Sequence, residues 1–346
     1  MILLSVSFKL LLIIILLLII SKKFIIFNDN DKVFVHKSFV HKTNNEQQKI
    51  IGGIFLGISI YFFFPDDLQL LKNYSLIFLF IGLMSDRNII DHPLPRFILQ
   101  FVFLISFILI ADLKINRINL DFFDILLSID IFNIFFTGLC LIILINGSNF
   151  LDGLNSLVSG YFLIVSICIY LLCNKLNSNF DILGLQILII ALIIFLFCNI
   201  LNFAILGDGG SYLLSFVVGV LLINFISQNS EISPYFAALM LWYPAFENLF
   251  SLLRRKLVES KDPSKPDSKH LHQLIYLFIS QKRIVRKSFS NSFSGLSILF
   301  FNGVVFLVSI NFYNQSKVLI TFVVLNIFAY LSLYIYLNKK LFTNKK

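Results

Sequence analysis

Charge, cysteine and tryptophan are scarce in this 346-residue chain. Charged residues make up 14% of it, whereas hydrophobic residues make up 58%. A soluble globular domain carries about 25% charged residues, so the composition excludes that class. The four cysteines (Cys140, Cys168, Cys173 and Cys198) lie in or beside apolar runs without paired spacing. This arrangement argues against a disulfide framework and against a cysteine metal site.

The apolar residues gather into runs long enough to cross a bilayer, which takes about 20 residues in a helix. We therefore expect an all-α polytopic membrane protein that forms one domain over residues 1–346. The first run lacks a small-residue cleavage site and is followed by Lys22 and Lys23, which favours a retained helix over a signal peptide. Hydropathy predicts about eleven spans: 2–20, 50–64, 71–84, 97–111, 131–145, 154–172, 181–201, 212–227, 235–253, 292–312 and 318–337.

Basic residues are spread unevenly over the predicted loops. With the N-terminus outside and the C-terminus in the cytoplasm, the cytoplasmic segments hold 22 of the 28 Lys and Arg residues. The positive-inside rule predicts this asymmetry. The net charge of +9 is therefore interpreted as an orientation signal in a plasma or inner membrane. A nucleic-acid partner is not expected, because the basic groups are spread over membrane-flanking loops.

Residues 146–160, NGSNFLDGLNSLVSG, place polar side chains between two predicted spans. Asn146, Asn149, Asp152 and Asn155 recur at every third residue, so on a helix they form one stripe. A plain loop explains the glycines as turn residues but not this spacing. Polar groups at membrane depth are costly and tend to mark a site. The stripe is therefore a candidate binding surface.

Further polar stretches fall on the same predicted cytoplasmic side. Asp86 ends one span, and GDGGS at 207–211 contains Asp208. Together with Asp152, these carboxylates lie among many Lys and Arg residues, which suits phosphates bridged by Mg²⁺, with Mn²⁺ as an alternative ion. Taken alone, Asp86 beside Arg87 also fits a solvated flanking pair.

The last large cytoplasmic loop, 254–291, contains His270 and His272 in a hydrophilic segment. In an extended segment these two side chains point the same way and can flank one phosphate or sugar group. A Zn²⁺ site is a weaker interpretation, because the pair lacks a matched third ligand nearby. Arg255 lies in a basic run that, by itself, is typical of a membrane stop signal.

Five stretches in order resemble the polyprenyl-phosphate N-acetylhexosamine-1-phosphate transferases, glycosyltransferase family 4. NGSNFLDGLNSLVSG is similar to the family motif N-[AG]-x-N-x-x-D-G-[LIVF]-[DN]-G-L. The resemblance spans residues 50–275, the expected motif-bearing core. The other four stretches are IGLMSDR (81–87), LGDGGSYLLSF (206–216), YPAFENLFSLLRRKL (243–257) and PDSKHLHQL (266–274).

The resemblance implies transfer of N-acetylhexosamine-1-phosphate from a UDP-sugar to polyprenyl (undecaprenyl) phosphate, which starts cell-surface glycan synthesis such as that of lipopolysaccharide. By family position, Asp208 would bind Mg²⁺ and Asp86 would lie near the metal and the lipid phosphate. Asn149, Asp152 and Asn155 would lie along the nucleotide. The residues that would contact phosphates or sugar are Arg255, His270 and His272. A homodimer is plausible for this family.

The chain departs from the family pattern at several positions. Ser85 takes the first place of the usual Asp-Asp pair, and Asn155 replaces the second Asp of the D-G-x-D form. Gln273 stands where a third His is frequent. The early cytoplasmic loop keeps His41, Lys49 and Gly52-Gly53, and Lys49 is a candidate substrate-binding residue. The Asn usually found upstream of Gly207 is Asn199 or Asn202.

Two alternatives stay open at this level. A lipid-linked-sugar transporter would also carry intramembrane polar groups, but it should place them near the midplane on broken helices. A catalytically inactive family member is the second alternative, motivated by Ser85. The particular UDP-sugar and the glycan pathway do not follow from the sequence.

Overall fold

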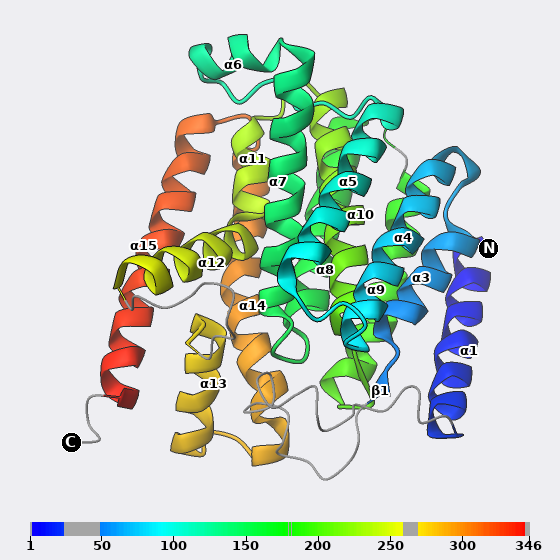
Figure 1. Ribbon diagram of the computed structural model, residues 1–346, viewed down its shortest axis with the longest axis vertical. Helices are drawn as coiled ribbons and strands as arrows, with labels where there is room; N and C mark the ends of the chain where they lie inside the picture. Colours follow the sequence, from blue (N-terminus) through cyan, green and yellow to red (C-terminus); the bar gives the residue numbers. More distant parts are fainter. Residues whose placement is uncertain (1, 24–48, 179, 181, 259–268, 343–346) are drawn as a thin grey trace.

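The computed structural model describes residues 2–23, 49–178, 180, 182–258 and 269–342, and shows a bundle of helices (Figure 1). His41 of the early loop lies outside the described residues. The long helices are α1 (Ile2–Lys23), α4 (Gln69–Asp86), α5 (Pro93–Ala111), α7 (Asp130–Leu151), α8 (Leu157–Leu176), α9 (Ile182–Ile200), α10 (Gly207–Gln228), α14 (Ser290–Ser309) and α15 (Ser316–Phe342). The shorter elements are α3 (Gly52–Phe63), α6 (Asp121–Leu127), α11 (Pro234–Met240), α12 (Trp242–Leu253), α13 (Leu271–Lys282) and the strands β1 (Lys49–Ile50) and β2 (Ala204–Ile205).

The predicted all-α polytopic class agrees with this architecture. Within the described ranges, nine helices are long and apolar enough to cross a membrane, or ten if the bent pair α11–α12 is one span. The count of eleven predicted from hydropathy is therefore not reproduced. The difference is α3, whose 12 residues rise about 18 Å, short of a hydrocarbon core of about 30 Å.

Helix α10 forms the centre of the bundle, because 83% of its apolar window is buried by other helices. The corresponding values are 17% for α1 and 22% for α15, which lie at opposite sides of the bundle (Figure 1). Helix α10 packs most closely against α4. A side chain on Gly82 of α4 would collide with the backbone of Gly209, so the two helices meet backbone to backbone.

The two ends of the bundle differ. One end carries β1, β2 and α13, and the opposite end carries α6 (Figure 1); they are called the α13 end and the α6 end below. The α13 end is the predicted cytoplasmic side. There β1 and β2 pair in parallel, with Lys49 opposite Ala204. This pairing brings the early loop beside the residues that lead into α10.

The span predicted at 235–253 is broken. Helices α11 and α12 differ in direction by 67°, and α12 crosses the bundle at a steep angle to its neighbours (Figure 1). Pro244 lies in the first turn of α12 and has no N–H to give to Met240, four residues earlier. The carbonyl of Met240 accepts instead from the hydroxyl of Tyr161 on α8 at 2.8 Å, which stabilises the bend.

Candidate functional site

The site centres on Asp208, the second residue of α10 and 5% exposed. Its Oδ1 accepts a hydrogen bond from Asn149 Nδ2 of α7 at 2.7 Å. Its Oδ2 accepts from the Ser85 hydroxyl of α4 at 2.6 Å. The GDGGS stretch is therefore the first turn of a helix, and its carboxylate joins the ends of three helices.

Asp86 lies against the same turn and caps α10. Its Oδ1 accepts from the backbone N–H of Asp208 at 2.9 Å, and its Oδ2 accepts from that of Gly209 at 3.2 Å. The first N–H groups of a helix lack partners within the helix, and a carboxylate there also interacts favourably with the helix dipole. The preceding Gly207 has a φ of +76°, and a Cβ on it would come 2.9 Å from Asp86 Oδ2. A glycine lets the chain turn at this point without displacing the cap.

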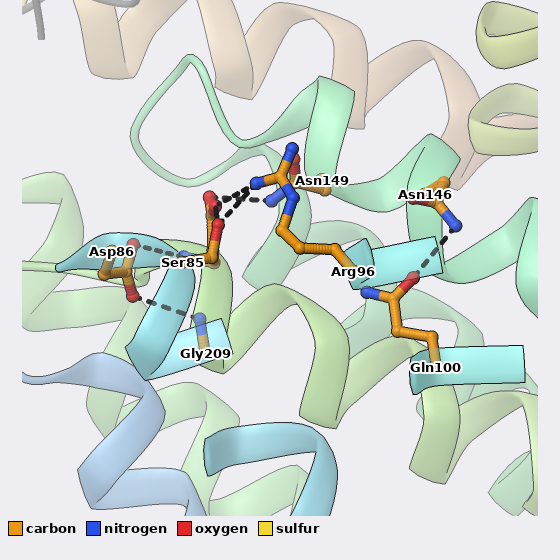
Figure 2. A network of polar contacts seen from close by, with 8 residues as sticks. Ser85, Asp86, Arg96, Gln100, Asn146, Asn149 and Gly209 are labelled. Atoms are coloured by element: carbon orange, nitrogen blue, oxygen red, sulfur yellow. Dashed lines mark hydrogen bonds and ion pairs between the residues drawn. The ribbon is translucent and has the colours of Figure 1, made fainter. Parts of the chain in front are cut away.

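A cation that the sequence analysis counted only as a topology signal completes this group. The Nη1 of Arg96, from the first turn of α5, donates to the Ser85 hydroxyl and lies 3.5 Å from Asp208 Oδ2. Figure 2 shows the Arg96 side chain extending to Ser85 from the neighbouring helix. The position that the resemblance gives to an Asp is thus a serine that bridges an arginine and an aspartate.

Within the Asn146–Asn155 stripe, the Asn149 side chain contacts Asp208 and others contact residues outside the Asp208 group. Helix α7 continues through Leu151, so Asn146 and Asn149 are helical and lie on one side of α7 (Figure 2). Asn149 contacts Asp208, whereas Asn146 Nδ2 donates to Gln100 Oε1 of α5 at 3.2 Å. Gln100 is fully buried, and it lies one turn after Arg96.

Asp152 and Asn155 belong to the turn between α7 and α8. Asp152 is the C-cap of α7. Asn155 is 2% exposed; its backbone N–H donates to Asn291 Oδ1 and its side chain donates to Asn202, both at 2.7 Å. Ser156 adopts a left-handed φ of 71° and donates its N–H to Asn199. Both asparagines proposed upstream of Gly207 therefore hold this turn.

The two histidines come together beside α7, but not in an extended segment. His270 precedes α13 with an extended backbone, whereas His272 lies inside the first helical turn, so the predicted extended conformation is wrong for His272. The rings still stack, 5.5 Å apart at 16°. Both side chains are buried, at 6% and 0% exposure, although α13 itself packs mainly on α14 and α15.

Phe150 links the histidines to the centre. Its ring stacks on that of His270 at 5.6 Å, and it follows Asn149 on α7. His272 Nε2 lies so close to Gly153 that a Cβ there would be 2.9 Å away. On its other side, His270 Nδ1 lies 2.9 Å from Glu247 Oε1 of α12.

The remaining candidates, Lys49 and Arg255, lie in the flanking elements. Lys49 begins β1, beside the strand that leads into α10. Arg255 is 6% exposed and belongs to a π-helical turn, Arg254–Val258, that continues α12. Its neighbour Arg254 lies over the ring of Tyr334 at 5.8 Å, so the basic run is folded against α15.

The donor set suits a hard cation that shares its coordination with a substrate. Mg²⁺ is typically held by one or two carboxylates together with substrate phosphates, and Asp208 offers one carboxylate among oxygen-bearing side chains. For a Zn²⁺ site, three protein ligands are normal. In the part of the chain that the structure describes, no group of three or more His, Cys, Asp or Glu side chains is placed to hold a metal.

Comparison with known proteins addresses the same region. Residues 68–226 match the family model described as glycosyl transferase family 4. This part of the chain is therefore similar to that family. The matched residues include the whole Ser85–Asp86–Arg96 group, the Asn146–Asn155 stripe and Asp208. The family model does not reach Lys49, Arg255, His270 or His272.

A curated relative carries a more specific name. The chain is 29% identical over 174 residues to the undecaprenyl-phosphate alpha-N-acetylglucosaminyl 1-phosphate transferase of Thermotoga maritima, an alignment that covers 49% of this chain and 52% of the relative. The chain thus spans about half the length of the curated relative it matches. The family resemblance inferred from the motifs is confirmed.

Sequence reasoning missed three residues of this candidate site. Arg96 was seen only as a basic residue near a span, Gln100 as part of an apolar helix, and Glu247 as part of a resembling stretch. A charged or amide side chain in an apolar run was the available signal for Gln100 and Glu247. Nothing in the sequence pattern points Arg96 at Asp208, 112 positions away.

Proposed function

We propose that this protein transfers an N-acetylhexosamine-1-phosphate group from a UDP-sugar to polyprenyl phosphate at the α13 end, the predicted cytoplasmic face. The observation that carries the proposal is Asp208, a buried carboxylate in contact with Ser85 and close to Arg96 at the meeting point of three helices. The family match and the name of the Thermotoga relative support the reaction class.

In this reaction a phosphate oxygen of the lipid forms a bond to the β-phosphorus of the UDP-sugar. The bond between that phosphorus and the bridging oxygen breaks, and UMP leaves with the electron pair. Both reactants are anions, so bringing them together is the main obstacle. Mg²⁺, when bound with the substrate at Asp208, would neutralise pyrophosphate charge.

The protein's own residues supply the remaining parts. Arg96 brings a planar guanidinium, which matches phosphate geometry, into the group around Asp208. Asp86 fixes the first turn of α10 and with it the carboxylate of Asp208. His270, His272, Arg255 and Lys49 provide further nitrogen donors on surrounding elements. The lipid phosphate is already ionised at neutral pH, so the proposal needs no general base.

An apolar cavity that none of the site residues described above lines suits the polyprenyl chain of the lipid rather than its phosphate. It has a volume of about 500 Å³ and lies between α7, α10, α11 and α12. Its lining includes Cys140 and Leu144 of α7 and Leu249 of α12. Lys114, where the cavity meets the α6 end, forms ion pairs with Asp112 and Asp130 at 3.0 and 3.1 Å. These hydrogen bonds raise the pKa of Lys114.

The transporter alternative receives less support from the placement of the polar groups. Asp86 is the last residue of α4, Asp208 is the second of α10, and Asn149 lies two residues before the end of α7. These positions are helix ends rather than interruptions at mid-span, where transporters place their sites. The inactive alternative rests on Ser85, and a turnover assay decides it.

The test is an assay on purified protein in nanodiscs. It would be given undecaprenyl phosphate, Mg²⁺ and each member of a panel of UDP-sugars, including UDP-GlcNAc and UDP-GalNAc. We expect UMP and polyprenyl-diphosphate-sugar in equal amounts with at least one donor. Absence of both products over the whole panel, while a transferase run in parallel is active, would reject the proposed function.

A further inference from the structure

Glu247 is a buried carboxylate for which the reaction described above has no role. It lies near the middle of α12 and is 1% exposed. Phe246, the residue before it, and Phe250, about one helical turn further on, pack against the ring of Tyr330 at 5.0 and 5.4 Å. Burying a carboxylate among such groups is costly unless a partner compensates it. The buried carboxylate of Glu247 therefore requires a hydrogen-bonding or charged partner that offsets its desolvation.

The partner is His270. Its Nδ1 lies 2.9 Å from Glu247 Oε1, and both side chains are buried. Since a carboxylate accepts, Nδ1 is the nitrogen that donates to it. A carboxylate behind one ring nitrogen fixes the orientation of the imidazole and decides which nitrogen serves a ligand. Nε2 is then the ring nitrogen of His270 that is left to bind a phosphate.

The pair connects to the Asp208 group through the end of α7. The ring of His270 stacks on Phe150, and Asn149, the residue before Phe150, donates to Asp208 Oδ1. Helix α12 also packs closely on α7, because a Cβ on Gly147 would collide with the Pro244 carbonyl. Glu247, His270 and the centre of the site are thus held by one helix end.

We propose that Glu247 is a positioning residue that orients the His270 imidazole for phosphate binding in the transfer reaction. This inference rests on the proposed function. Glu247 itself does not touch the reacting groups; it acts through His270. In this proposal, the bend between α11 and α12 also serves to place the Glu247 carboxylate against Nδ1 of His270 in the last loop.

A double-mutant cycle tests this role. Glu247→Gln keeps the size and an acceptor but removes the charge, and we expect it to lower kcat/KM at least tenfold. His270→Ala should cause a similar or larger loss. The double variant should be no more than about twofold worse than His270→Ala, because residues that act as one unit are not additive. Glu247→Asp, which keeps the charge, should retain more activity than Glu247→Gln.

A matched control is available at the α6 end. Asp66→Asn removes the same kind of charge from an ion pair with Lys72 at 3.1 Å, and it should leave kcat/KM unchanged. If Glu247→Gln fails to insert, the same comparison is made with Glu247→Ala, which also removes the charge. Near-wild-type activity of the Glu247 variant, or losses that multiply in the double variant, would overturn the positioning role.

A second measurement does not depend on any substrate. The chain has five histidines, so the imidazole signals of ¹⁵N-histidine-labelled protein can be compared between variants by solid-state NMR. Glu247→Gln should move the one signal that His270→Ala removes. A spectrum unchanged by Glu247→Gln rejects the inference. Lack of turnover by the wild type over the whole donor panel would count against the proposed function instead.

Discussion

The carboxylate of Asp86 holds the backbone N–H of Asp208 at 2.9 Å. Two acidic residues that lie 122 positions apart are thereby joined by a hydrogen bond to the main chain. The second oxygen of Asp86 accepts from the N–H of Gly209. The main structural role of the Asp86 carboxylate is therefore to cap the N-terminus of α10. The two carboxylates are accordingly expected to respond differently to the same substitution.

Asp86→Asn should lower stability by about 1–2 kcal/mol, since one acceptor becomes an amide that faces a backbone N–H. Thermal unfolding of the purified protein in detergent measures this. Asp67→Asn, at an exposed position of the α6 end, is the control and should change stability by less than about 0.5 kcal/mol. Equal melting of Asp86→Asn and wild type would contradict the capping role.

Asp208→Asn should abolish transfer, by at least about a hundredfold, while membrane insertion stays normal. The change removes the charge that a metal requires and keeps the side-chain size. Turnover at saturating Mg²⁺, compared with the amount of folded protein, is the measurement. Near-wild-type turnover of this variant would make the assignment of Asp208 as metal ligand wrong.

Ser85→Asp should reduce the Mg²⁺ concentration needed for half-maximal rate by about threefold, or roughly 0.6 kcal/mol, because it adds negative charge beside Asp208. Arg96 on the same group offsets the added repulsion. Mg²⁺ titrations of the wild type, Ser85→Asp and Ser85→Ala provide the comparison. A higher Mg²⁺ requirement in Ser85→Asp than in Ser85→Ala would speak against a cation site at this point.

His272→Ala should lower kcat/KM at least about tenfold, equivalent to roughly 1.4 kcal/mol, because its ring lies against that of His270 and beside the turn after α7. Gln273→Ala should have a milder kinetic effect. Gln273 Oε1 accepts from the backbone N–H of His270 at 3.1 Å, so its loss should appear mainly in stability, at about 1 kcal/mol. Equal, near-wild-type kinetics for both variants would return this segment to a structural role.

The orientation can be tested by labelling single cysteines in a cysteine-free background. Gln281 at the α13 end and Ser128 at the α6 end are both exposed. An impermeant reagent added outside intact cells should label Ser128→Cys and leave Gln281→Cys unlabelled until the membrane is opened. The reverse pattern would invert the topology and place the candidate site outside.

Much of the architecture could be predicted from the sequence, because membrane-spanning helices are recognisable as continuous apolar runs. Residues 131–145 and 212–227 were recognised in this way, although α7 and α10 extend beyond them by several residues. The bend in α11–α12 was not foreseen. The bend depends on Pro244 and on the hydrogen bond from the Tyr161 hydroxyl of α8, and a hydropathy profile indicates neither of them.

The candidate site was predictable to the extent that its residues sit at helix ends on one side of the membrane. That Asn149 and Asp208 lie at the same end of the bundle follows from that reasoning, whereas the hydrogen bond between them does not. The separate tasks of Asn146 and Asn155, which bind Gln100, Asn202 and Asn291, do not. They depend on which helices become neighbours, and a single polar stripe does not specify its partners.

The backbone contact between Gly82 and Gly209 has a mechanical consequence. Ser85, Asp86 and Asp208 are carried by two helices that touch without intervening side chains, so their spacing is set by main-chain geometry and has little room to adapt. His270 and His272 stand on a short helix that rests on α14 and the peripheral α15. If the protein acts as proposed, we therefore expect any adjustment to substrates of different size on the histidine side, because the close contact between α4 and α10 fixes the spacing of the carboxylates.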